Sequence, residues 1–261
     1  MLKNNKLILF FTILFFLVAV SSLGYICYDN FKDDDKVDVK NKQNNGSIIK
    51  EEEELDINSR LVRSLYNKVG LVKNSSNRYE SYKDNDNLLV KDMSDEDKLA
   101  LVYSNLSSSL FDTIPNNDLG QSISIEGSNY NYDYELFLNS YGWVDFIDFS
   151  LVELEFKTLF GNNATFSKDS LIRADSSSLL YYVYNEDLNG YIPYSTVGGY
   201  EGGISYVGKV VGAFKTSKNI IIKEEVTIVT PEGDSKSIGI YDYTFSIDDD
   251  LMYSFVSRIK E

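Results

Sequence analysis

The hydrophobic pattern begins with a long uncharged run near the N-terminus, Leu7–Ile26. A helix that rises about 1.5 Å per residue needs roughly 20 apolar residues to cross a bilayer, and this run is long enough. Lys3 and Lys6 precede the run, whereas Asp29 and Asp33 follow it. Because basic residues stay on the cytoplasmic side, the pattern predicts a single-pass helix whose C-terminal domain lies outside the membrane.

Two other interpretations of residues 1–28 remain open. The run can be a cleavable signal peptide with Ser22–Gly24 as its small-residue cleavage site, in which case the protein is secreted. It can also be a lipoprotein signal that ends at Cys27, although bulky Tyr25 and Ile26 precede that cysteine. A buried core helix is excluded because the run has no polar face to turn toward water.

The rest of the chain divides into a polar linker at residues 29–54 and an extracytoplasmic domain at residues 55–261. Apolar residues at helical spacing predict helices over residues 57–69, from Ser94 to about residue 110, and over residues 150–160. Ser94 is expected to cap the second helix, and Gly161 is expected to end the third.

From residue 179 the apolar period changes to two, which predicts strands. The expected strands cover residues 179–184, 203–216, 220–229, 237–247 and 251–259. Short turns between the last strands require antiparallel hairpins. We therefore expect an α+β fold: an N-terminal transmembrane helix, a linker, and helices packed on one face of an antiparallel β-meander of four to five strands.

Composition excludes several kinds of chemistry. The chain has no histidine, and its single cysteine is Cys27, so Ser-His-Asp and Cys-His catalysis and zinc sites built on these residues are excluded. The net charge of −15 argues against nucleic acid as a partner and against anionic lipid headgroups. Acidic clusters such as 248–250 lack the spacing of a calcium-binding EF-hand loop. We therefore expect neither a cofactor nor a metal.

A glycine-flanked tyrosine segment is the first candidate for partner binding. Tyr191 and Tyr194 precede a Gly-rich loop that contains Tyr200 and Glu201, and the three tyrosines could form an exposed contact surface for a glycan, a peptide or another protein. The alternative is a connection between strands whose tyrosines cover a sheet edge. Trp143, the single tryptophan, could stack on a sugar or anchor an interface, or it could belong to the core.

Glu224 and Glu225 adjoin in a predicted strand, so one carboxylate points to each face of the sheet. An inward carboxylate with a raised pKa could act as a general acid, whereas a solvent-facing pair would be structural.

The order of one helix followed by four long strands, over about residues 150–260, resembles the cystatin-like and NTF2-like α+β rolls. The whole layout resembles the uncharacterised single-pass, membrane-anchored extracytoplasmic proteins of AT-rich Gram-positive bacteria. This resemblance implies a non-enzymatic, membrane-tethered binding or scaffolding domain of the cell envelope, with an envelope protein or glycan as partner. The alternatives are a carboxylate-dependent envelope glycan hydrolase and a secreted surface interaction factor.

Overall fold

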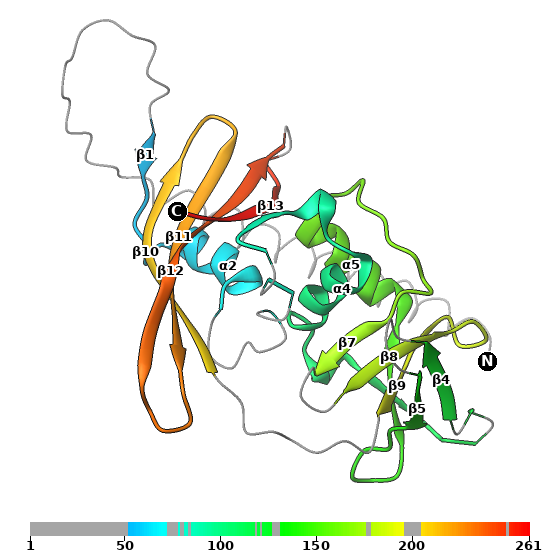
Figure 1. Cartoon of the computed structure of the whole chain (residues 1–261). Coiled ribbons are helices and arrows are strands. Elements are labelled where there is room, and N and C mark those ends of the chain that lie inside the picture. Colours follow the sequence, from blue (N-terminus) through cyan, green and yellow to red (C-terminus); the bar gives the residue numbers. More distant parts are fainter. Residues whose placement is uncertain are drawn as a thin grey trace, which may run out of the picture. The chain divides into compact units, whose positions relative to one another are not determined.

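Residues 50–261 form one compact unit in the computed structural model. The structure describes residues 52–71, 78, 81–82, 85–117, 119–120, 122–126, 131–175, 179–195, 205–248 and 251–261. Two antiparallel sheets make up most of this unit, and the helices α4 and α5 lie between them (Figure 1).

The first sheet is built around the C-terminal meander, in the strand order β1-β10-β11-β12-β13-β2. Its strands are β1 (Glu53–Glu54), β2 (Asn87–Leu89), β10 (Ser205–Lys215), β11 (Asn219–Val229), β12 (Ser235–Ile247) and β13 (Tyr253–Lys260). Alternate residues of β11 are buried, as expected for a strand with one face on the core. Segments from the start of the domain thus complete both edges of a sheet formed by its end.

The second sheet has the strand order β3-β6-β9-β5-β4, and β8 pairs with both β7 and β9. Its strands are β3 (Asp112–Ile114), β4 (Ser122–Glu126), β5 (Asn131–Leu136), β6 (Val144–Asp148), β7 (Ile172–Asp175), β8 (Leu180–Asn185) and β9 (Gly190–Ser195). Both β5 and β6 pair with β9: Leu136 lies opposite Tyr194, and Ile147 lies opposite Tyr191. Tyr191 and Tyr194 are three residues apart on β9, whereas their partners Ile147 and Leu136 are eleven residues apart. The chain between β5 and β6 therefore forms a loop that leaves the sheet.

The described α-helices are α2 (Arg60–Val69), α4 (Asp95–Tyr103) and α5 (Phe149–Phe160), with the short 3-10 helices η1 (Val90–Asp92) and η2 (Ser108–Leu110). Ser94 caps α4 as predicted, because its hydroxyl accepts a hydrogen bond from Asp97 N. Gly161 ends α5 as predicted, with a φ of 99° that favours glycine. The helix α2 begins at Arg60, later than the pattern predicted, with Ser59 as its cap.

One hydrophobic cluster spans both sheets and all three helices. Phe156 on α5 is buried, whereas Leu154 on the same helix points to solvent. Arg173 on β7 forms an ion pair with Asp97 on α4, with 3.0 Å between Nη2 and Oδ1. The two halves of the unit therefore share one core.

The predicted fold class is wrong. The structure is mostly β, with 44% strand and 22% helix, and it contains two large antiparallel sheets instead of one meander with helices on one face. The last four predicted strands form an antiparallel meander, but the strand predicted at residues 179–184 is β8 of the second sheet, and the rest of that sheet was missed. The strands of the second sheet are short, and β3, β4 and β5 lie between residues 110 and 150, where the sequence analysis placed no helix or strand.

Among the residues that the structure describes, no helix is long and apolar enough to span a membrane. The predicted transmembrane segment Leu7–Ile26 and most of the linker lie outside those residues.

Candidate functional site

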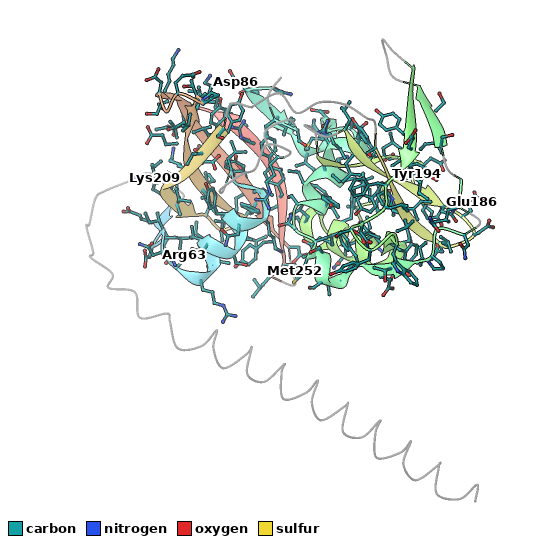
Figure 2. The ribbon with its side chains drawn as sticks, turned by 90° about the horizontal axis from the view of Figure 1, so that it is seen from below. Arg63, Asp86, Glu186, Tyr194, Lys209 and Met252 are labelled. Carbon is teal, nitrogen blue, oxygen red and sulfur yellow. The ribbon has the colours of Figure 1, made fainter. Side chains whose placement is uncertain are left out.

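The tyrosines of the first candidate surface do not form an exposed patch. Tyr191 is fully buried and Tyr194 is 3% exposed, because both belong to β9, the central strand of the second sheet. Figure 2 labels Tyr194. The Tyr194 hydroxyl donates a hydrogen bond to Gly120 O (3.0 Å), and burial raises the pKa of both phenols. Their predicted exposure is wrong, while Tyr200 and Glu201 lie outside the described residues.

Trp143, in contrast, is 45% exposed, which contradicts the alternative that it belongs to the core. It lies in the segment that loops out between β5 and β6. Three further large apolar side chains of this segment are also exposed: Phe137, Leu138 and Tyr141. The sequence analysis singled out Trp143 and missed these neighbours, although the Tyr-Gly-Trp sequence between two strands was a usable signal.

Glu224 is the inward carboxylate of the Glu224–Glu225 pair, and its side chain is fully buried. Its Oε1 accepts hydrogen bonds from the Tyr66 hydroxyl (2.6 Å) and from Leu71 N (2.7 Å). Its Oε2 accepts a hydrogen bond from the Tyr243 hydroxyl (2.6 Å), which in turn accepts one from Arg258 Nε (2.9 Å). We call these five residues the Glu224 network.

Burial raises the pKa of Glu224, and the hydrogen bonds from Tyr243, Tyr66 and Leu71 and the charge of Arg258 oppose that rise only in part. The Arg258 guanidinium, 2% exposed, lies 3.5 Å from the Tyr241 ring centroid. Gly208 makes room for the network, because a Cβ at this position would overlap Glu224 Oε1.

The Glu224 network cannot act on a substrate in this conformation. A general acid must reach the reacting group within about 3 Å or through one water molecule. Glu224 has no exposed surface, and both of its oxygens are occupied by donors of the protein itself. The network therefore joins α2 and the segment after it to β11, β12 and β13.

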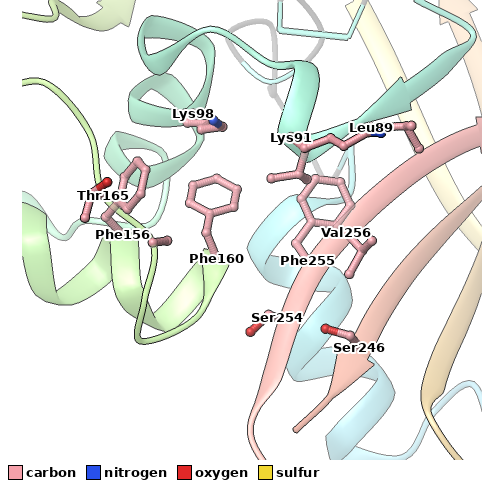
Figure 3. Close-up of a pocket in the computed structure, with 12 residues that line it drawn as sticks. Leu89, Lys91, Lys98, Phe156, Phe160, Thr165, Ser246, Ser254, Phe255 and Val256 are labelled. Carbon is pink, nitrogen blue, oxygen red and sulfur yellow. The ribbon is translucent and has the colours of Figure 1, made fainter.

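A cleft of about 460 Å³ lies between the first sheet and the helices α4 and α5 (Figure 3). Phe156 and Phe160 of α5 form one wall, and Phe255 and Val256 of β13 form the other. The remaining lining residues come from β2, η1, α4, β12, β13 and the loop after α5: Leu89, Val90, Lys91, Lys98, Ala164, Thr165, Ser246 and Ser254.

Polar groups lie at two ends of this cleft. Lys91 and Lys98 lie at one end, whereas the hydroxyls of Ser246 and Ser254 lie at the other (Figure 3). Lys98 has a long ion pair with Asp95, with 3.9 Å between Nζ and Oδ1, and Lys91 has no ion pair with any described residue. The described lining residues include no carboxylate, so the cleft combines an apolar body with a positive end.

The described residues contain no cluster of metal-ligating side chains. The cleft was not predicted from the sequence, because its lining comes from segments separated by more than a hundred positions and carries no local motif. Comparison of the chain with protein-family models, with curated proteins and with solved structures gave no significant match.

Proposed function

We propose that this protein is a non-enzymatic binding domain, tethered to the outer face of a bacterial cell membrane by Leu7–Ile26, whose cleft binds a small amphipathic anion. The observation that carries the proposal is the cleft itself. Its walls are three phenylalanines and aliphatic side chains, and its charged lining residues are both lysines.

Such a lining suits a ligand with an apolar ring or chain and one carboxylate, sulfonate or phosphate group. Ligand sites are typically apolar concavities in which a few polar groups fix the orientation. The phenylalanine walls would bury the apolar part, while Lys91 and Lys98 would hold the anion and the serine hydroxyls would supply hydrogen bonds at the opposite end.

A carboxylate-dependent hydrolase is the less favoured alternative. It requires two carboxyl groups on either side of a substrate, about 5 to 10 Å apart. The described lining of the cleft has none, and Glu224 is enclosed by its own hydrogen-bond donors. Removal of the N-terminal segment would convert the tethered domain into a secreted binding factor with the same cleft.

Calorimetric titration with naphthalene-2-sulfonate and with the neutral analogue naphthalene-2-methanol tests the cleft. We expect the full chain, in lipid nanodiscs, to bind the sulfonate more tightly. Lys91→Met with Lys98→Met should weaken sulfonate binding by on the order of tenfold, because a charge-assisted contact is lost, and should leave the alcohol unaffected.

Lys157→Met is the matched control, since Lys157 lies on α5 but pairs with Glu153 outside the cleft. Equal affinity for the two probes, or an equal loss in the control, would refute an anion site in the cleft.

The tether is tested separately by adding protease to intact, wall-stripped cells. A domain on the outer face should be digested while the cells remain sealed. Full protection of the domain under these conditions would refute the orientation.

A further inference from the structure

The loop between β5 and β6, residues Phe137–Trp143, is the largest exposed apolar feature on a single short segment of the described chain. We call it the aromatic loop. Tyr141 is 86% exposed, Trp143 45%, Phe137 42% and Leu138 40%, and the loop contains no charged residue. Isolated exposed apolar residues are common, but four on one seven-residue loop mark a contact surface.

Asn139 holds this loop in shape. Its Oδ1 accepts hydrogen bonds from Tyr141 N (3.0 Å) and Trp143 N (3.2 Å), and its Nδ2 donates one to Asp145 Oδ1 (2.9 Å). Asn139 N also donates to Trp143 O, which closes the loop. Gly142 adopts a φ of 77°, where a side chain would be strained.

The aromatic loop is also anchored at its base. Phe137 N donates a hydrogen bond to Pro193 O (2.9 Å). The strand before the loop, β5, and the strand after it, β6, both pair with β9. The exposed side chains are therefore displayed on a fixed backbone, so little conformational entropy is lost when they bind.

We propose that the aromatic loop inserts into the interface of the membrane to which the chain is tethered. The inference rests on the proposed function, because it requires the tether at Leu7–Ile26. Tryptophan and tyrosine favour the headgroup level of a bilayer, while phenylalanine and leucine favour the acyl boundary below it. The aromatic loop carries one residue of each of these four types.

The length of chain before the domain makes this contact possible. About 25 linker residues separate the apolar segment from the first strand, and an extended chain spans at most about 3.3 to 3.6 Å per residue. The tether therefore keeps the loop within reach of the same membrane. The tether also makes insertion of the loop an intramolecular event. A contact between loop and lipid that is too weak to hold a free domain on the membrane is then formed for much of the time.

The absence of charge on the loop favours lipid over a sugar polymer or a protein partner. Glycan and protein sites usually combine aromatic rings with hydrogen-bonding or charged side chains at the rim. The net charge of −15 excludes steering by anionic headgroups, so a zwitterionic surface is the fitting one.

Trp143 is the only tryptophan, so its fluorescence reports on this loop alone. The full chain is reconstituted in phosphatidylcholine vesicles, with or without bromine on the acyl chains. We expect brominated lipid to quench Trp143. Leu138→Ser with Tyr141→Ser should remove at least about half of this quenching, because the apolar insertion is lost.

Leu251→Ser with Met252→Ser is the matched control. It removes similar exposed apolar area at the turn between β12 and β13, and Met252 lies apart from Tyr194, which pairs with the strand leading into the loop (Figure 2). This variant should be quenched like the unaltered chain. Circular dichroism of both variants establishes that the fold is kept.

The outcomes separate the loop from the tether. A chain that resists extraction from vesicles at alkaline pH but shows no quenching refutes the loop insertion and leaves the tether intact. A chain that is extracted refutes both. A Trp143 emission shift with soluble peptidoglycan fragments, without quenching by brominated lipid, would identify a glycan surface and also overturn the proposal.

Discussion

Replacing Glu224 by leucine tests the energetic role of the Glu224 network. Leucine has a similar volume, so the change removes the carboxylate without opening a large cavity. It leaves the hydroxyls of Tyr66 and Tyr243 and the amide of Leu71 without their acceptor.

The expected loss follows from these groups. An unsatisfied buried donor costs about 1–3 kcal/mol, and Glu224→Leu leaves three of them, on Tyr66, Tyr243 and Leu71. The donors can partly rearrange, so we expect Glu224→Leu to lower the free energy of unfolding by about 3–5 kcal/mol. This is a large share of the roughly 5–15 kcal/mol that stabilises a typical domain.

Chemical denaturation of the fragment 50–261, followed by circular dichroism, measures this loss. Glu224→Gln is the comparison, because its amide oxygen can still accept hydrogen bonds. A loss below about 1 kcal/mol for Glu224→Leu would show that the network does not support the fold.

The same pair of proteins gives a pH dependence whose sign can be worked out. The pKa of Glu224 is raised above its ordinary value of 4.5, so the folded chain keeps a proton that the unfolded chain releases. This contribution is fully present below pH 4.5 and is lost as the pH rises toward the raised pKa. The free energy of unfolding of the unaltered fragment should therefore fall, relative to Glu224→Gln, as the pH increases above 4.5. A rising difference would refute the shift.

Two further substitutions test packing. Phe156→Ala should lower the free energy of unfolding in urea by about 3–5 kcal/mol, because the ring is 1% exposed. Leu154→Ala on the same helix should lower it little, since Leu154 is 65% exposed, and similar losses for the two variants would contradict the orientation of α5. Gly208→Ala should lower the melting temperature more than Gly212→Ala does. The added Cβ would overlap Glu224 Oε1 at position 208 but would lie 3.3 Å from the Phe214 ring at position 212. Equal shifts in melting temperature would contradict the close approach of Glu224 to Gly208.

The sequence analysis located those helices and strands whose apolar residues recur at a regular spacing. The strands β10–β13 and the helix α5 are long, their apolar periods are clear, and their ends carry turn or capping residues, so they were placed within a few residues. Apart from β8, the second sheet was missed because its strands are short and one of them, β9, is buried at almost every position. A continuously buried strand shows no alternation, and its tyrosines were taken for a loop surface.

The sites were harder to predict than the elements. The sequence analysis predicted that one carboxylate of the pair Glu224 and Glu225 could face inward, but it did not identify Glu224 as that one. The partners of Glu224 were not predicted either, since Tyr66 lies 158 positions away and its hydroxyl reaches the carboxylate only after α2 packs on the sheet. The cleft likewise depends on tertiary structure.

The strand order of the first sheet sets when this protein can fold. A chain made from its N-terminus holds Leu88 and Leu89 long before it holds Arg258 and Ser257, with which they pair at the sheet edge. The Glu224 network has the same property, because Arg258 supplies its last member.

Neither the sheet edge nor the Glu224 network can thus be completed until β13 has been synthesised. Folding dominated by such distant pairings is slow. Removal of β13 would therefore leave a nascent domain unable to close.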